Sequence, residues 1–267
     1  MTGVSVNMTG MMTAVDVEAP VGAVSGFEAV YVEPDGSECR VEWQRLARVG
    51  LEWGRPVRRF PSYRGQRSYP GLYWSATMGG HIGYESWVER DHLVALDFDR
   101  SVVGIASQPF WLLWRTEAGP QRRHAPDFFV RRADGGALVV DSRPAELVGP
   151  DDAAVFAMTG RACALLGWDY LVWDVIDPLV AGNLRWLAGY RHPRCWHEPT
   201  VERLREVFAR ALGLIAGAEL VGDPIAVLPV LFHLLWRGDL VADLSLVLGD
   251  RTVVRRRELA VGGGGRG

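Results

Sequence analysis

The sequence predicts an α/β fold in which a mixed β-sheet core is flanked by helices and followed by a smaller, helix-rich domain. Between Tyr84 and Val175, segments with strand-like alternation stand between two stretches with helical periodicity. Beyond Pro199 the pattern changes to two helical stretches and a pair of short strands. With 267 residues, of which 48% are apolar and 23% charged, the chain is long enough for one large domain or two smaller ones.

The amino-terminal part is expected to contain one small hairpin between irregular segments. Residues 1–25 show neither a helical nor a strand period, so we expect them to be disordered. The segments Phe27–Val32 and Cys39–Trp43 alternate on either side of an Asp-Gly pair, which predicts a hairpin. The segment Arg55–Trp74 then interleaves five arginines with aromatic residues, prolines and glycines. This basic arm either contacts a nucleic-acid backbone or connects two elements as a solvated loop.

The central part supplies the predicted sheet and its flanking helices. Apolar residues recur at the 3.6-residue period over Tyr84–Phe98, and a second helix is predicted over Asp151–Leu166, which ends at a glycine. The predicted strands are Val102–Ser107, Trp111–Arg115, His124–Arg131, Ala137–Ser142 and Asp169–Val175.

The carboxy-terminal part is expected to form a separate module. Helices are predicted over Thr200–Ile215 and Ala226–Arg237, followed by strands Leu240–Leu248 and Arg251–Val254. This order is typical of a winged-helix domain. The module contacts either DNA, through arginines, or a partner protein, through an apolar face around Leu228, Leu231, Phe232 and Leu235. We therefore divide the chain into a domain over residues 26–196, a winged-helix-like domain over 197–260 and a flexible glycine-rich tail over 261–267.

Composition excludes several kinds of chemistry. All 29 basic residues are arginines, so a lysine-containing phosphate loop, a pyridoxal phosphate aldimine and a lysine general base are excluded. The three cysteines are widely spaced, which favours free thiols. No apolar run reaches the roughly 18 residues of a membrane helix, and no signal peptide is recognisable, so we expect a cytoplasmic protein without a membrane partner.

Three acidic residues stand where a sheet would bring them together. Glu89 lies on the first predicted helix, Asp127 follows Pro126 at the head of a strand, and Asp141 lies near the end of the next strand. An unpaired buried carboxylate is costly, so these acids should pair with arginine, accept hydrogen bonds or bind a hard cation. Carboxylate oxygens are ligands that Mg²⁺ prefers, so Glu89, Asp127 and Asp141 are the predicted metal ligands.

Arg143 adds a cation to this pattern, because residues two apart on a strand share a face. The sequence Asp141-Ser142-Arg143, preceded by Pro126-Asp127 on the neighbouring strand, resembles the PD-(D/E)xK nuclease pattern. In that superfamily the acids hold magnesium and the cation faces the scissile phosphate or the attacking water. The resemblance makes Glu89, Asp127, Asp141 and Arg143 the candidate catalytic residues.

A closer resemblance, over roughly residues 27–195, is to the TnsA-like endonuclease subunit of heteromeric transposases. It implies a restriction-endonuclease-like core, a winged-helix-like carboxy-terminal domain, and Mg²⁺, for which Mn²⁺ can substitute. It also implies that the protein cleaves double-stranded DNA at transposon ends, cutting the strand that a partner DDE transposase leaves uncut. An AAA+ ATPase regulator is the second implied partner. The motifs that carry it are Glu85-Ser86-Trp87-Val88-Glu89-Arg90-Asp91, Leu96-Asp97-Phe98-Asp99, Gln108-Pro109, His124-Ala125-Pro126-Asp127-Phe128 and Val139-Val140-Asp141-Ser142-Arg143.

The chain departs from the family pattern at the cation. The family commonly has Gln or Glu, any residue and then Lys, whereas this chain has Asp141 and Arg143. A guanidinium, with a pKa above about 12, cannot act as a base, so Arg143 would stabilise charge while metal-bound water supplies the nucleophile. Two alternatives are a non-catalytic DNA and protein adaptor that has lost the lysine, and an independent restriction-type nuclease.

Other polar residues have both a functional and a structural interpretation. Glu85, one turn before Glu89, either supports the site or competes for the same role. His192, Cys195 and His197 lack a nearby fourth ligand, which disfavours structural zinc. The candidate nucleic-acid contacts are Arg58, Arg59, Arg64, Arg67, His124, Arg255, Arg256 and Arg257.

Overall fold

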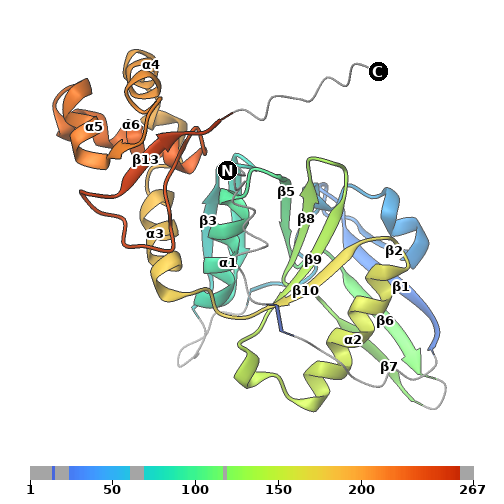
Figure 1. Cartoon of the computed structure of the whole chain (residues 1–267). Coiled ribbons are helices and arrows are strands. Elements are labelled where there is room, and N and C mark those ends of the chain that lie inside the picture. Colours follow the sequence, from blue (N-terminus) through green and yellow to red (C-terminus); the bar gives the residue numbers. More distant parts are fainter. Residues whose placement is uncertain (1–13, 16–23, 61–68, 117–118, 259–267) are drawn as a thin grey trace, which may run out of the picture. The chain divides into compact units, whose positions relative to one another are not determined.

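The computed structural model describes residues 14–15, 24–60, 69–116 and 119–258, and shows a mixed α/β protein with several sheets (Figure 1). The described residues up to Ile176 form one compact unit, and those from Asp177 onward form another. The tail at 261–267 and most of segment 1–25 lie outside the described residues. Within that segment, Val15 N donates a hydrogen bond to Val172 O at 2.8 Å, so at this point the chain pairs with a strand.

The first sheet of the amino-terminal unit is antiparallel throughout, with strand order β2-β1-β6-β7. It confirms the predicted first hairpin, in which Tyr31 lies opposite Cys39. The turn is closed by Asp35, whose Oδ1 accepts from Ser37 N at 2.8 Å, and by Gly36 at a positive φ of 96°. The strands are β1 (Val24–Val32), β2 (Glu38–Glu42), β6 (Trp111–Thr116) and β7 (Gln121–His124).

The second sheet is mixed, as predicted, with strand order β10-β9-β8-β5. Its β5–β8 and β8–β9 pairs are antiparallel, whereas β9 and β10 are parallel. A parallel pair needs a long crossover, which here includes helix α2 (Pro150–Ala164). The strands are β5 (Val102–Ser107), β8 (Phe128–Arg132), β9 (Ala137–Ser142) and β10 (Asp169–Trp173).

The prediction of one strand over His124–Arg131 is wrong. Strand β7 ends at His124 in the first sheet, and β8 begins at Phe128 in the second. Pro126 stands between them and has no N–H to continue a ladder. The chain changes sheets at this bend, which is where Asp127 lies.

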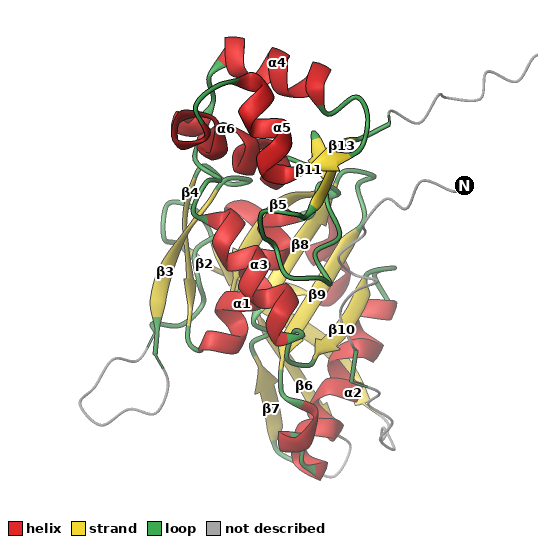
Figure 2. Cartoon of the chain, turned by 60° about the vertical axis from the view of Figure 1, so that its left-hand side comes forward, coloured by secondary structure: helices red, strands yellow, loops and turns green. Residues whose placement is uncertain are grey.

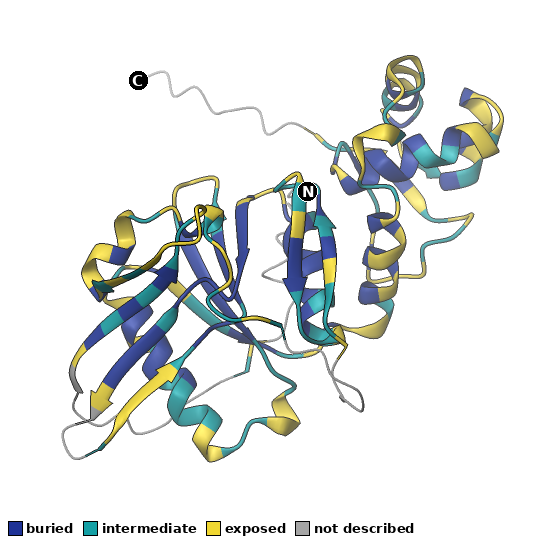
Figure 3. Ribbon diagram, turned by 180° about the vertical axis from the view of Figure 1, so that it is seen from behind, coloured by how far each residue is buried: buried dark blue, intermediate teal, exposed yellow. Residues whose placement is uncertain are grey.

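Large aromatic side chains fill the core of this unit. The Trp43 ring packs edge-on against Phe110 and Trp168, and Phe129 packs against the same Trp168 ring. Trp43 Nε1 donates to Ala162 O on α2 at 2.6 Å, so the indole is bonded as well as buried. Figure 3 shows the buried positions concentrated on the strands of this unit.

Helix α1 (Trp87–Phe98) confirms the first predicted helix but begins later than Tyr84. The residues before it form a hairpin of β3 (Gly71–Ser75) and β4 (Gly80–Tyr84), so part of the predicted irregular arm is regular strand. Asp97 on α1 fixes the hairpin turn by accepting bonds from Ser75 Oγ and from the backbone N–H groups of Ala76 and Thr77. The short 3₁₀ helices within the described residues are η2 (Trp43–Arg48), η3 (Leu51–Trp53), η4 (Ala145–Leu147) and η5 (Pro193–Cys195).

The described part of the carboxy-terminal unit combines four α-helices with a small sheet of order β11-β13-β12 (Figure 2). This part begins at Asp177, upstream of the predicted boundary near residue 196. The difference arises because helix α3, which the sequence analysis did not predict, belongs to this unit. Asn183 on α3 donates to Leu244 O and Leu246 O at 2.9 and 2.7 Å, and Trp186 packs edge-on against Phe232. The elements are α3 (Pro178–Ala188), α4 (Glu198–Val207), β11 (Leu212–Gly213), α5 (Leu214–Val221), α6 (Pro224–Trp236), β12 (Leu240–Val241) and β13 (Val253–Arg256).

Two predicted elements of this unit differ from the structure. The predicted helix Thr200–Ile215 is broken where β11 separates α4 from α5, and only the first two residues of the predicted strand Leu240–Leu248 form β12. Among the described residues, no single helix is long and apolar enough to span a membrane. Helices α5 and α6 meet the length and hydropathy criteria only when they are taken together, and this pair is bent by 119°.

Candidate functional site

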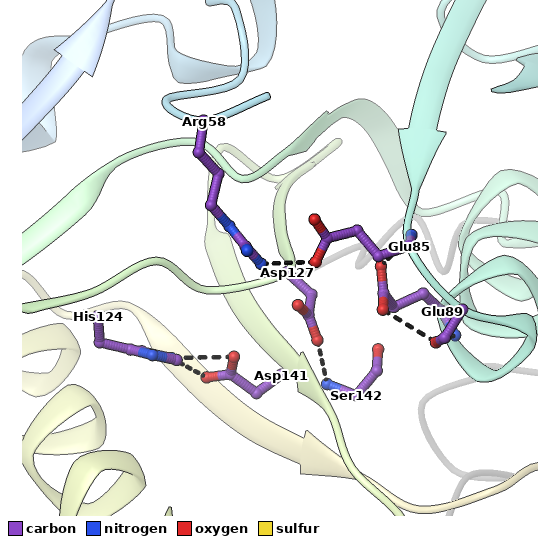
Figure 4. Close-up of polar contacts among 8 residues, drawn as sticks. Arg58, Glu85, Glu89, His124, Asp127, Asp141 and Ser142 are labelled. Carbon is purple, nitrogen blue, oxygen red and sulfur yellow. Dashed lines mark hydrogen bonds and ion pairs between the residues drawn. The ribbon is translucent and has the colours of Figure 1, made fainter. Parts of the chain in front are cut away.

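The three predicted acids line one cavity of about 390 Å³ in the amino-terminal unit. Glu89 comes from α1, Asp127 from the bend between β7 and β8, and Asp141 from β9 (Figure 4). Arg143 and Ser142, which follow Asp141 in the sequence, also contribute to the wall. The structure therefore brings together the residues that the motif spacing predicted.

Asp127 is affected by the charges of the other two acids. Its Oδ2 accepts a hydrogen bond from Ser142 N at 2.7 Å, and its main-chain oxygen accepts from Gln108 N at 2.8 Å. Although the residue keeps some accessible surface, desolvation by burial raises the pKa of its carboxyl well above the ordinary value, and the charges of Asp141 and Glu89 raise it further. The negative potential at Asp127 thus disfavours ionisation of its carboxyl, and a cation bound beside it would relieve the repulsion.

Glu89 is held by the first turn of its own helix. Ser86 is the N-cap: its hydroxyl accepts from Glu89 N at 3.2 Å and donates to Glu89 Oε1 at 2.9 Å. Glu89 Oε2 accepts from Glu85 N at 2.7 Å. Burial raises the pKa of the Glu89 carboxyl in spite of these bonds. The residue therefore has a capping role that the sequence analysis did not assign to it.

Asp141 is buried and accepts hydrogen bonds from two side chains. His124 Nε2 lies 3.0 and 2.9 Å from its two carboxylate oxygens, and Tyr170 OH donates to Oδ2 at 2.7 Å. Burial and the Asp141 charge raise the pKa of Tyr170 well above its ordinary value, which keeps the hydroxyl protonated as a donor. In this structure His124, predicted to contact DNA, is instead bonded to Asp141.

His92 connects the site to the ends of two strands. The ring is fully buried, with Nδ1 2.8 Å from Ser142 Oγ and Nε2 2.7 Å from Asp174 O. Burial lowers the pKa of His92 to about 4, so the ring is neutral at pH 7. A neutral ring whose Nε2–H donates to the carbonyl leaves Nδ1 to accept from Ser142. The bond between His92 and the Ser142 hydroxyl fixes Ser142, whose backbone N–H in turn donates to the Asp127 carboxylate.

Two arginines at the cavity have acidic partners. Arg143 Nη2 bonds Asp152 Oδ2 on α2 at 2.8 Å, with both side chains substantially exposed. Arg58 Nη2 bonds Glu85 Oε2 at 2.7 Å, and this pair is less exposed. That Asp152 pairs with Arg143, and Tyr170 with Asp141, was not predicted from the sequence, because each contact joins residues whose proximity depends on the tertiary fold.

The remaining predicted nucleic-acid contacts fall into three groups. Arg59, Arg255 and Arg256 are exposed, whereas Arg257 Nε donates to Gly238 O at 2.8 Å. Arg64 and Arg67 lie outside the described residues.

The predicted apolar docking face on α6 is mostly interior. Leu231, Phe232 and Leu235 are buried in the core of their own unit, and Leu228 is half-buried. The face is therefore corrected to a core-packing face, because its side chains are already covered by the helices and strands of that unit.

The described residues include no group of three His, Cys, Asp or Glu side chains already arranged to hold a metal ion. The donor chemistry of the cavity still fits a hard divalent cation, since Glu89, Asp127 and Asp141 are among the carboxylates that line it and repulsion contributes to the raised pKa of Asp127. Asp141 would have to share its oxygens with His124 and Tyr170 to act as a ligand.

Comparison with protein families and with curated proteins identifies no relative, so the assignment of a function rests on the geometry of the cavity. No family model matches the chain, and no curated protein matches it.

Proposed function

We propose that the protein is a magnesium-dependent DNA endonuclease that hydrolyses a phosphodiester bond. The observation that carries this proposal is the convergence of Glu89, Asp127 and Asp141, from three separate segments, on one cavity. Their mutual repulsion favours occupation by a divalent cation, and arginines at the same cavity favour a phosphate.

Asp127 and Asp141, with Glu89, would hold the ion; Mg²⁺, for which Mn²⁺ can substitute, would polarise the phosphate and lower the pKa of a bound water. The chain itself fixes the acids. Ser142 N–H orients Asp127, while His124 and Tyr170 orient Asp141. No lysine is present and a guanidinium stays protonated, so the arginines bind and neutralise phosphate rather than accept a proton.

The substrate and partners of this proposal come from the resemblance to TnsA-like subunits. We propose cleavage at transposon ends of the strand left uncut by a DDE transposase, in a complex with an AAA+ ATPase regulator. The mixed sheet β10-β9-β8-β5 with α1 and α2 supports a restriction-endonuclease-like core. Helices α4 to α6 with the sheet β11-β13-β12 support a winged-helix-like domain.

A second candidate function is a nuclease-like adaptor that binds DNA and protein without cutting. It is favoured by the hydrogen bonds that already occupy both Asp141 oxygens and by the absence of a preformed three-residue metal group among the described positions.

Nicking of DNA carrying the transposon ends, by the full-length chain together with its DDE transposase partner, separates the two functions. The variant Asp127→Asn keeps the shape of the side chain and the acceptor for Ser142 N–H but removes the charge. We expect it to lose about 10²–10³-fold in nicking rate in Mg²⁺ or Mn²⁺, as when one transition-state-stabilising group is removed. The matched control is Asp169→Asn, an exposed acid that pairs with Arg132 on the same sheet, which should nick normally. Unimpaired nicking by Asp127→Asn would exclude the proposed site, and no nicking by the wild-type complex would favour the adaptor.

A further inference from the structure

Three arginines line the cavity, and they differ in what holds them. The Arg123 guanidinium lies over the Trp111 ring, 4.4 Å from its centroid. Arg143, the cation of the sequence motif, is paired with Asp152 on α2. Arg58 comes from the irregular segment after η3 and is paired with Glu85, directly before the N-cap of α1.

Arg58 is electrostatically coupled to the catalytic candidates. Its positive charge opposes the rise in the carboxyl pKa of both Glu89 and Asp127. It therefore lies near enough to two of the three acids to act on a group bound beside them. Figure 4 shows the Arg58 side chain extending toward Glu85, with Asp127 next to the pair.

The Arg58–Glu85 pair is incompletely hydrogen-bonded. Arg58 Nε and Glu85 Oε1 are both buried and have no hydrogen-bond partner among the described residues. A single Nη2–Oε2 contact uses only part of a guanidinium that offers five N–H donors. A phosphate, which accepts paired N–H bonds from one guanidinium, would satisfy more of these donors than Glu85 does.

We propose that Arg58 is the guanidinium that binds the DNA phosphate at this cavity, and that Glu85 holds Arg58 in place while no DNA is bound. The inference rests on the proposed nuclease function. It assigns the phosphate-binding role to Arg58, which is distant in sequence from the Asp141-Ser142-Arg143 motif. Arg143 then links the end of β9 to α2 through Asp152.

This exchange of partners predicts opposite effects for the two members of the pair. Removing Arg58 takes away one phosphate contact, so DNA binding weakens. Neutralising Glu85 removes one negative charge and replaces a carboxylate with a weaker amide acceptor, so Arg58 is released more easily and DNA binding strengthens, provided that Arg58 is present. An ion pair that only stabilised the fold would give the same direction of change for both substitutions.

The test is the salt dependence of binding to a fluorescein-labelled random-sequence DNA duplex, measured by fluorescence anisotropy with the full-length chain in Ca²⁺, so that no cutting is required. For Arg58→Ala we expect weaker binding and a slope of log K against log[salt] smaller by about 0.9, the value for one lost phosphate contact. Glu85→Gln should bind more tightly than wild type, and the double variant no more tightly than Arg58→Ala. If Arg58→Ala melts at a lower temperature than wild type, Arg58→Gln, which keeps most of the side-chain volume, takes its place in the comparison.

The matched control is Arg45→Ala, which removes an exposed arginine of the same unit that is loosely paired with Glu42, and it should bind as wild type does. A wild-type slope for Arg58→Ala, or weaker binding by Glu85→Gln, overturns the inference. The nuclease function is judged separately by Asp127→Asn. If that variant loses nicking while Arg58→Ala keeps the wild-type slope, the function stands and the assignment of Arg58 falls. If Asp127→Asn still nicks while Arg58→Ala loses one contact, the proposed site falls and the phosphate contact stands.

Discussion

The backbone N–H of Ser142 donates a hydrogen bond to the Asp127 carboxylate at 2.7 Å, which joins the bend before β8 to the end of β9. Ser142 is itself held through its hydroxyl by His92. The position of Asp127 therefore depends on α1 as well as on the two strands. This network makes the site part of the folded core, so changes in the site should alter stability in ways that can be measured.

The stability of the wild-type protein should reflect the raised pKa of Asp127. A carboxyl whose pKa is higher in the folded state than its ordinary value of 3.8 binds more protons when folded, so its contribution to the free energy of unfolding falls as pH rises above about 4. Asp127→Asn removes this contribution and should be more stable than wild type at pH 7. Urea unfolding at a series of pH values measures the difference. A variant less stable than wild type at pH 7 would show that Asp127 is favourably paired.

Removing the hydroxyl of Tyr170 should destabilise the fold. Tyr170→Phe keeps the ring but leaves the buried Asp141 carboxylate without one of its donors. Hydrogen bonds to charged groups contribute about 1.5–3 kcal/mol, so we expect a loss of that size in the free energy of unfolding. Tyr69→Phe, at an exposed tyrosine, is the control and should unfold as wild type does. Equal stability of the two variants would mean that the Tyr170 bond contributes nothing.

His92 should make the fold sensitive to acid. Its pKa is lowered from 6.5 to about 4 by burial, so the unfolded chain takes up a proton at this residue before the folded protein does. The stability that depends on neutral His92 is complete above pH 6.5 and is lost as pH falls toward 4, which is opposite to the trend from Asp127. His92→Gln should flatten this part of the urea-unfolding profile, whereas His81→Gln, at an exposed histidine, should not. A wild-type profile for His92→Gln would contradict the assignment.

Gln108 combines backbone strain with an unsatisfied side chain. Its φ is +46°, and both polar atoms of its buried amide lack hydrogen-bond partners among the described residues. Gln108→Leu removes the unsatisfied polar atoms at similar volume, so we expect the free energy of unfolding to rise by about 1 kcal/mol. Thermal and urea unfolding both measure it. A loss of stability instead would show that the amide has a partner, such as an ordered water.

The sequence predicted the parts of the site that depend on local pattern. The predicted strand Ala137–Ser142 coincides with β9, whereas the predicted strand His124–Arg131 joined parts of β7 and β8. The spacing of Asp127 and Asp141 on neighbouring segments still indicated that the two acids lie close together, and both line one cavity. The pairing of Arg58 with Glu85 was not predictable, because the two residues are brought together only by the packing of an irregular segment against the start of α1.

One helix that the sequence analysis missed, α3, does have a recognisable start signal in the sequence. Asp177-Pro178 is an N-cap followed by proline at the first helical position, which marks the start of α3. The break between α4 and α5 had no comparable local signal. Phe208 packs so closely on Gly217 that a Cβ there would lie 2.2 Å from the ring, and this contact between segments favours two short helices over one long one.

The capacity of the cavity to hold a divalent ion is tested most directly by titrating Mn²⁺ into the full-length protein by calorimetry, with Asp127→Asn and Asp169→Asn measured beside wild type. The account predicts that wild type and Asp169→Asn bind Mn²⁺ alike and that Asp127→Asn binds it much more weakly. Equal Mn²⁺ binding by all three proteins, or none by wild type, would contradict it.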